Sequence, residues 1–215
     1  MSPALWVTQI LPDTRASNDA QRDVENAVDL HRSVMRLFPD GLGDTARQTA
    51  SVLFRLDEGP AGHQILIQSA VEPDLTRLSP GYGKARTKEL TPLLAALRPG
   101  ALVHYRITAN ATRKLGKNTT AGRPKQLVPL HGQEAEEWWL RQAERAGLQP
   151  RTVQNTALSD ATGRRQGQHR ITHARTRFDG LAEVHDVEAL TEQIATGIGR
   201  GKSYGCGLLS VAPAR

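Results

Sequence analysis

The chain has 215 residues, of which 38% are hydrophobic and 4% aromatic, enough to bury the core of one large domain or two small ones. Its single cysteine, Cys206, excludes an internal disulfide and favours a reducing cytoplasm, and no apolar run reaches the length of a signal peptide or a membrane span. The net charge of +6 comes from the second half, because residues 1–100 have a net charge of −1 and residues 101–215 one of +7.

The first half of the chain predicts a strand, a helix and a pair of strands. The expected elements are a strand at residues 5–11, a helix from Asn26 to Phe38, and hairpin strands at residues 51–56 and 64–71. Asn26, with Asp29 three residues later, resembles a capping box, which sets the start of the helix. Prolines at positions 73, 80 and 92 predict irregular chain over residues 72–92, before a short helix that ends at Leu97.

The second half predicts a more regular alternation. The expected elements are strands at residues 101–109, 152–158, 169–178 and 208–212, helices at residues 132–146 and 187–196, a basic loop at 110–125 and a basic turn at 162–167. The order β-α-β-β-α-β is that of a ferredoxin-like domain, and the first half follows its opening part. We therefore predict an α+β fold of two tandem ferredoxin-like (RRM-like) domains, residues 1–97 and residues 98–215.

Two windows of the second half contain basic residues and no acidic ones. They are residues 101–133, with Arg106, Arg113, Lys114, Lys117, Arg123 and Lys125, and residues 161–178, with Arg164, Arg165, Arg170, Arg175 and Arg177. Positive charge without interleaved acid favours a polyanion partner, most simply a nucleic acid. The alternative is an ordinary solvated basic face.

The end of the chain is rich in glycine, with Arg200 and Lys202 between glycines over residues 197–207. A nucleotide-binding P-loop would need glycine where Thr196 stands, and a dinucleotide-binding loop would need glycine where Tyr204 stands. Exposed N–H groups and two cations suit a phosphate. The alternative is a loop without a ligand that enters the last strand.

His31 lies on the apolar face of the first predicted helix. A histidine in such a place is most often a core residue. The alternative is that the imidazole meets a substrate at an open edge of the sheet, where it would serve as a general acid or base. Arg36, further along the same helix, could then stabilise anionic charge.

The sequence contains no clear metal site. His169 and His173 are four residues apart, a spacing that on a strand separates them by about 13 Å. Nuclease chemistry here would then need no metal, which restricts it to RNA, where the 2′-OH attacks the adjacent phosphate. Its products are a 2′,3′-cyclic phosphate and a 5′-OH.

Four stretches together resemble one family. They are the glycine-rich ending at residues 197–213, Asp29-Leu30-His31-Arg32, Gln68-Ser69-Ala70-Val71-Glu72-Pro73-Asp74, and Leu97-Arg98-Pro99-Gly100 leading to Arg106-Ile107-Thr108-Ala109-Asn110. The ending is similar to the glycine-rich loop of the RAMP superfamily. The combination, which spans nearly the whole chain in order, resembles the CasE family of CRISPR RNA-processing endoribonucleases of type I-E Cascade complexes.

The resemblance implies two ferredoxin-like domains and metal-independent cleavage of a CRISPR repeat RNA hairpin, without a cofactor. It implies that the protein stays on its product as a partner of other Cascade subunits, and we expect a monomer when it is free. By position, His31 and Arg36 are the catalytic candidates. The RNA-binding candidates are Arg113, Lys114, Arg164, Arg165, Gly199, Arg200, Gly201 and Lys202.

The sequence departs from the family pattern at Val28, where relatives often have a tyrosine three residues before the histidine. A phenol that could orient or donate a proton is absent there. Tyr82, Tyr105 or Tyr204 could take its place. The alternative function is therefore an RNA-hairpin-binding Cascade subunit with weak or no catalysis, and a third hypothesis is a nucleotide-binding regulator that uses the C-terminal loop.

Overall fold

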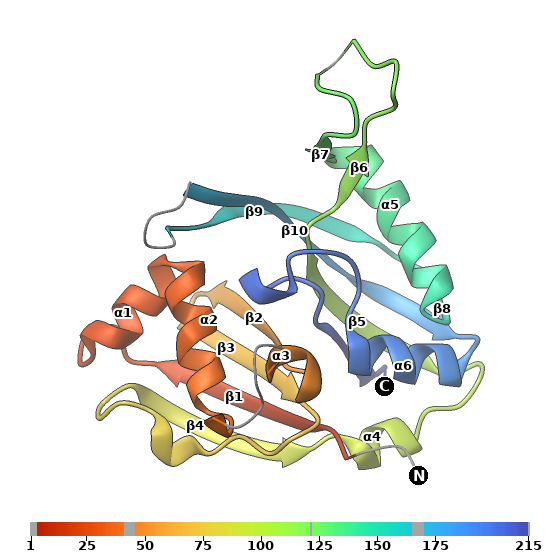
Figure 1. The fold of residues 1–215 in the computed structure, drawn as a ribbon. Helices are drawn as coiled ribbons and strands as arrows, with labels where there is room; N and C mark the ends of the chain where they lie inside the picture. Colours follow the sequence, from red (N-terminus) through yellow and green to blue (C-terminus); the bar gives the residue numbers. More distant parts are fainter. Residues whose placement is uncertain (1–3, 41–45, 121, 165–169, 215) are drawn as a thin grey trace.

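The computed structural model describes residues 4–40, 46–120, 122–164 and 170–214, which form two antiparallel sheets with helices (Figure 1). The first sheet has the order β2-β3-β1-β4. Its strands are β1 (Trp6–Pro12), β2 (Leu53–Gly59), β3 (Gly62–Ser69) and β4 (Gly83–Glu89). The helical segments around it are α1 (Asn18–Glu25), α2 (Ala27–Arg36), α3 (Ala46–Thr49), η2 (Leu75–Arg77) and α4 (Thr91–Ala95).

The second sheet has the order β11-β5-β10-β8, and β9 also pairs with β10. Its strands are β5 (Leu102–Ala109), β8 (Leu148–Pro150), β9 (Gln154–Arg164), β10 (Arg170–Val184) and β11 (Leu209–Pro213). The helical segments are α5 (Gly132–Arg145), α6 (Val187–Thr196) and η3 (Lys202–Tyr204), and a separate hairpin is formed by β6 (Thr112–Lys114) and β7 (Leu127–Pro129). In both sheets the first strand lies between the last two strands, β1 between β3 and β4 and β5 between β10 and β11, which confirms the predicted α+β, ferredoxin-like architecture.

Two separate cores support the two sheets. Phe38, Phe54 and Ile65 belong to the first core, and Trp139 and Phe178 belong to the second. Each core lies mainly between one sheet and its own helices, as expected of two units that each bury an apolar face, and Leu94 of α4 packs against the second core. The boundary between residues 97 and 98 stays a prediction.

The helix ends follow the sequence closely. Asn26 caps α2, and its side chain accepts hydrogen bonds from the N–H groups of Val28 and Asp29. Asp186 caps α6 in the same way, and Gly197 ends that helix with a φ of 77°. These caps confirm the predicted helix starts and the predicted end of α6, because a side-chain acceptor and a left-handed residue each satisfy local backbone groups.

The prediction of irregular chain over residues 72–92 was wrong for β4, which pairs with β1 along its whole length. Lys84, Arg86 and Lys88 alternate along this edge strand and are exposed, so the apolar pattern of a strand is missing. The flanking prolines lie outside the strand. At Gly83 an added Cβ would lie 2.0 Å from the carbonyl oxygen of Leu11, so this strand end requires glycine.

Further elements were not predicted, namely α1, β6, β7, β8 and the short helical segments α3, η2 and η3. The polar helix α1 begins at a Ser17 cap and lacks a long apolar stripe. The loop expected over residues 110–125 contains β6 and leads into β7, and the short strand β8 pairs with the far end of β10. Strands β9 and β10 also extend beyond their predicted bounds, so that part of the predicted basic turn belongs to β9.

Arg55 on β2 joins the two sheets. It is 3% exposed, and its Nε donates to both carboxylate oxygens of Asp57 at 2.9 and 3.0 Å. Its Nη1 donates to the carbonyl oxygens of Arg106 on β5 and Leu208, and to Ser210 Oγ on β11, at 3.1–3.3 Å. Burial lowers the pKa of Arg55, and the Asp57 carboxylate opposes that shift. A second contact, from Gln68 Nε2 to the carbonyl oxygen of Ile194, links β3 with α6.

We expect Arg55→Met to lower the free energy of unfolding by about 3–5 kcal/mol, because it leaves the half-buried Asp57 carboxylate and two carbonyl groups without their donor. Urea denaturation measures the change. The matched control is Arg86→Met on β4, where an exposed arginine hydrogen bonds to Gln9 and a loss under about 0.5 kcal/mol is expected. A loss for Arg55→Met as small as that of the control would contradict this role.

Candidate active site and nucleic-acid interface

His31 lies at the margin of the first core. Helix α2 packs Leu30 and Val34 against the sheet, and the half-buried His31 ring stacks on Phe54 of β2, with ring centroids 6.0 Å apart and planes at 25°. One side of the imidazole therefore packs against the first core, as expected for a histidine on the apolar face of this helix. Its exposed part leaves it within reach of a substrate, which is what a general acid or base requires.

The glycine-rich ending reaches the same place from the other end of the chain. The N–H of Ile198 donates to the carbonyl oxygen of Gly207, which closes the loop, and η3 within the loop contacts both α2 and β2. An added Cβ on Gly205 would lie 3.5 Å from Phe54, the ring on which His31 stacks. Phe54 thus contacts the histidine and the loop together, and Figure 1 shows the loop beside β2.

The two cations of the loop have different surroundings. Lys202 Nζ donates to the carbonyl oxygen of Thr196 at 2.8 Å, where it stabilises the C-terminal end of α6. Burial and the neighbouring Arg47 guanidinium lower the pKa of Lys202. Arg200 is exposed, and its backbone forms a bridge with Asn110. Arg200 is therefore the cation of the loop that is open to a phosphate in this conformation.

The two glycine candidates of the loop lie against other elements. An added Cβ on Gly199 would lie 3.3 Å from Trp138 on α5, and one on Gly201 would lie 3.4 Å from Cys206. Both have φ near 75°, a conformation that residues other than glycine rarely adopt. These positions give the loop its path, and their contact with RNA stays a prediction.

Arg36 lies away from the loop. It is the last residue of α2, its Nη2 donates to Ser33 Oγ at 2.8 Å, and its carbonyl oxygen accepts from Arg77. At about 100° per residue, five positions along a helix place Arg36 and His31 on different faces. The structure brings His31 and the loop together but does not bring Arg36 with them, and its catalytic role stays a prediction.

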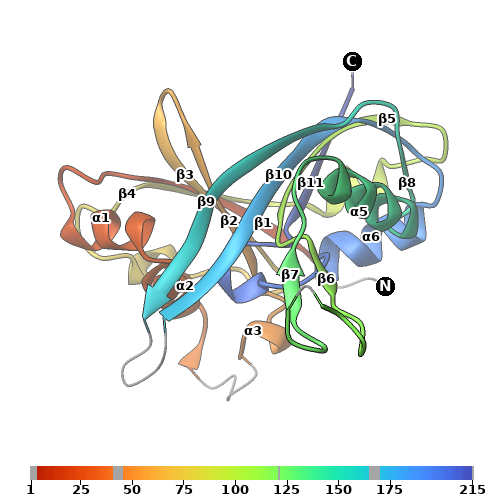
Figure 2. The same ribbon diagram turned by 90° about the horizontal axis from the view of Figure 1, so that it is seen from above.

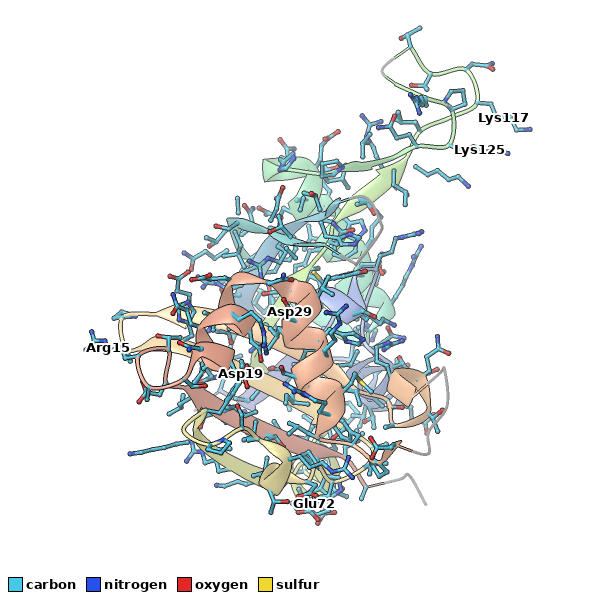
Figure 3. All side chains as sticks on the ribbon, turned by 60° about the vertical axis from the view of Figure 1, so that its left-hand side comes forward. Arg15, Asp19, Asp29, Glu72, Lys117 and Lys125 are labelled. Carbon is cyan, nitrogen blue, oxygen red and sulfur yellow. The ribbon has the colours of Figure 1, made fainter. Side chains whose placement is uncertain are left out.

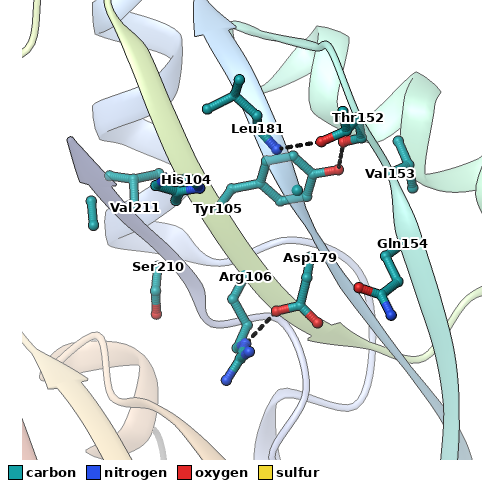
Figure 4. A pocket seen from close by; sticks show the side chains of 12 residues that line it. His104, Tyr105, Arg106, Thr152, Val153, Gln154, Asp179, Leu181, Ser210 and Val211 are labelled. Carbon is teal, nitrogen blue, oxygen red and sulfur yellow. Dashed lines mark hydrogen bonds and ion pairs between the residues drawn. The ribbon is translucent and has the colours of Figure 1, made fainter. Parts of the chain in front are cut away.

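The hydroxyl groups of two of the three tyrosines form hydrogen bonds within the cores. The Tyr82 hydroxyl donates to Asp23 at 2.9 Å. The Tyr105 hydroxyl donates to the carbonyl oxygen of Thr152 at 2.9 Å, and burial raises the pKa of Tyr105 to about 12 (Figure 4). Both phenols have structural partners, so neither is placed beside His31.

Tyr204 is the phenol that lies against α2. It is half-buried in η3, stacks on His173 with ring centroids 4.6 Å apart, and lines a small cavity with Ala27 and Leu30. Ala27 precedes His31 by one helical turn. Nothing in the sequence distinguishes Tyr204 from the other two tyrosines or points to Phe54, because both contacts join segments far apart in the chain.

A large cavity lies on a different face of the molecule. A volume of about 650 Å³ opens over β5, β10 and β11 and is bordered by His104, Tyr105 and the Arg106–Asp179 ion pair (Figure 4). None of the predicted site residues lines it. The candidate site is therefore the junction of α2 with the glycine-rich loop and not this cavity.

Arg113 and Lys114 lie on a basic arm, which we define as residues 112–129 apart from Ala121, built on the β6–β7 hairpin. The arm extends away from the rest of the molecule, with Lys117 and Lys125 at its far end (Figure 3). Leu115 is 5% exposed, and its N–H donates to the carbonyl oxygen of Gln126, so the two sides of the arm stay hydrogen-bonded beyond β6 and β7. Arg113 and Lys114 are exposed, and the described part of the arm contains no acidic residue.

Residues 162–164 of the predicted basic turn belong to β9, in the long β9–β10 ribbon that reaches from the second sheet to α2 (Figure 2). Arg164 is the last residue of β9 and pairs with Arg170. Arg165 and His169 lie outside the described residues. The role of this turn in RNA binding stays a prediction.

Within residues 4–40, 46–120, 122–164 and 170–214, no three His, Cys, Asp or Glu side chains gather where they could hold a metal ion. The helices of this same part are all too short or too polar to cross a membrane.

Known proteins resemble this chain over nearly its whole length. A family model described as CRISPR associated protein matches residues 5–213. A Thermus thermophilus protein named CRISPR-associated endoribonuclease Cse3 is 30% identical and covers 97% of this chain and 100% of its own length. The Escherichia coli CRISPR system Cascade subunit CasE is 29% identical, over 86% of this chain and 90% of that protein.

A solved structure has the same fold. Thermus thermophilus Cse3 bound to an RNA representing a pre-cleavage complex superposes with a TM-score of 0.80 at 28% identity, covering 98% of this chain and 100% of that one.

We expect Cys206 to be unreactive in the folded protein. Its thiol is fully buried behind the loop, and burial raises its pKa to about 12, so little thiolate forms near neutral pH. A thiol reagent such as DTNB should label it only after denaturation. Rapid labelling of native protein would contradict the closed packing of the loop.

Proposed function

This chain belongs to the CasE family of type I-E CRISPR-associated proteins, and from that premise we propose that it is an endoribonuclease that binds the CRISPR repeat hairpin and cleaves the precursor RNA. We propose that the protein then stays on the mature RNA beside other Cascade subunits, and that it is a monomer when free. The relatives' names support these partners, since one relative is named an endoribonuclease and another a Cascade subunit.

One observation carries the proposal. The half-buried imidazole of His31 and the glycine-rich loop both contact Phe54, although they come from opposite ends of the chain. A group that can move protons near neutral pH thus lies beside a loop that presents Arg200. Phosphate-ester cleavage uses both a group that transfers protons and a cation that offsets the charge of the phosphate.

The proposed reaction uses the nucleophile that RNA carries. The 2′-oxygen forms a bond to the adjacent phosphorus and loses its proton, while the bond from phosphorus to the 5′-oxygen breaks and that oxygen gains a proton. His31 serves as the general acid or base in these transfers, and the loop orients the phosphate and offsets its charge. The products are a 2′,3′-cyclic phosphate and a 5′-OH, and no metal ion or cofactor takes part.

A second candidate function is an RNA-binding Cascade subunit with weak or no cleavage. Val28 favours it, because this helix has no phenol one turn before His31. The position of Tyr204 against α2 favours the enzyme, because its ring supplies a phenol at the same junction. Tight binding of a repeat hairpin without any product over hours would decide for the second function.

We expect His31→Ala to abolish cleavage of a repeat hairpin RNA in EDTA while leaving its affinity within about threefold, because the imidazole moves protons and contributes little to phosphate contacts. Gel analysis of the products measures cleavage, and their resistance to ligation or phosphatase before acid treatment identifies the cyclic phosphate.

The matched control for this test is His185→Ala, which removes an exposed histidine from the second sheet's far end and should cut at the rate of the natural protein. Cleavage that survives in His31→Ala, or that needs added metal, would contradict the proposed mechanism.

We expect the double substitution Arg113→Ala with Lys114→Ala to weaken RNA binding and to lower the slope of log affinity against log salt by about 1 for each cation that meets a phosphate. Binding titrations at several salt concentrations measure the slope. Lys84→Ala with Lys88→Ala, on the exposed edge strand β4, is the control and should leave the slope unchanged. Equal slopes for both double variants would show that the basic arm does not touch the RNA backbone.

A further inference from the structure

Gly163, near the end of β9, lies directly against the start of α2. An added Cβ there would lie 2.4 Å from Val28 Cγ2, 3.1 Å from Val28 Cβ and 2.9 Å from Asn26 Oδ1. Gly163 is buried, and its φ lies outside the left-handed region in which glycine is needed for its backbone conformation. The reason for glycine at this position is therefore the close approach of β9 to the helix.

The atoms that Gly163 approaches define how α2 begins. Asn26 Oδ1 accepts the N–H groups of Val28 at 2.9 Å and Asp29 at 3.4 Å, which caps the helix. The N–H of Asn26 also donates to the carbonyl oxygen of Arg22, so the same residue ends α1. Gly163 thus covers the joint between the two helices, and a larger residue would press on the cap itself.

This joint lies one turn before His31. Val28 is 7% exposed and precedes His31 by three residues, so the two side chains are neighbours on the helix surface. Strand β9 packs against the first turn of α2, and Phe54 contacts His31 in the following turn. A displacement of the first turn would move the imidazole relative to Phe54 and the glycine-rich loop.

We propose that Gly163 is a positioning residue for His31: the absence of a side chain lets β9 of the second sheet fix the start of α2 and, through it, the place of the imidazole. This inference rests on the proposed function for its effect on cleavage. It also ties the site to the ribbon whose end carries Arg164, so that RNA held at that end and His31 belong to one packed unit.

The test is Gly163→Ala, with cleavage of bound RNA measured separately from binding. Single-turnover cleavage with protein in excess gives the rate, and affinity is measured in the His31→Ala background, where the RNA stays intact. Since a misplacement of about 1 Å can slow a reaction roughly a hundredfold, we expect the rate to fall by about tenfold or more and the affinity to change less than about threefold. A rate equal to that of the natural protein, or equal losses in rate and affinity, would overturn the proposal.

Two variants separate positioning from damage to the fold. Gly59→Ala is the matched control, because an added Cβ there meets nothing within 4 Å, and it should leave rate and melting temperature unchanged. Gly163→Ala combined with Val28→Ala removes the closest overlap and should regain part of the lost rate. If Gly163→Ala does not fold, Val28→Ala alone tests the contact without added bulk and should slow cleavage more than binding.

A readout without catalysis distinguishes this inference from the proposed function. The NMR signals of the His31 ring, assigned by their loss in His31→Ala, depend on the stacked Phe54 ring and should shift in Gly163→Ala but not in Gly59→Ala. If the natural protein cuts no RNA, the proposed function fails and these shifts alone decide the positioning role. Unchanged His31 signals in a folded Gly163→Ala protein would overturn it.

Discussion

The buried guanidinium of Arg55 is the interaction on which the arrangement of this molecule depends. Successive residues of a strand face opposite sides, so Phe54 points to the helices of the first sheet while Arg55 points to the second. Strand β2 therefore supports His31 with one residue and binds β5 and β11 with the next. Because the glycine-rich loop leads into β11, the same few hydrogen bonds that join the sheets also set the loop against the histidine.

In the second half of the chain, some basic side chains form ion pairs with acidic residues, and others are exposed without an acidic residue beside them in sequence. Asp179 lies one residue beyond the second acid-free window, and it pairs with Arg177 from that window and with Arg106 from the first. Arg151 pairs with Glu183 in the same sheet. The exposed cations of the basic arm have no such acidic neighbours within the arm itself. Within the described residues, the fold thus leaves the arm with exposed positive charge that no acidic residue of the arm offsets.

Much of the fold could be predicted from local sequence, because local groups decide it. Asn26 and Asp186 cap helices by their own side chains, and the alternation of buried residues marks β1 and β5. Strand β4 could not be predicted, since its stability comes from pairing with β1 and not from its own polar side chains. The same holds for the site: His31 and the loop were identified singly, whereas Phe54, Tyr204 and Gly163 acquire a role only when distant segments meet.

Glycine has a common use where these distant segments meet. Gly205 approaches Phe54, Gly199 approaches Trp138, and Gly163 approaches the cap of α2. At Gly163 the backbone lies where a side chain would overlap the start of α2, and at Gly199 and Gly205 it lies within contact distance of an aromatic ring. If an added side chain displaced one of these elements, the packed interior would transmit the displacement, because it contains little void space to absorb it. A site assembled from both halves in this way keeps its geometry only while both halves stay docked, which makes the docking of the sheets a condition for the chemistry and not only for stability.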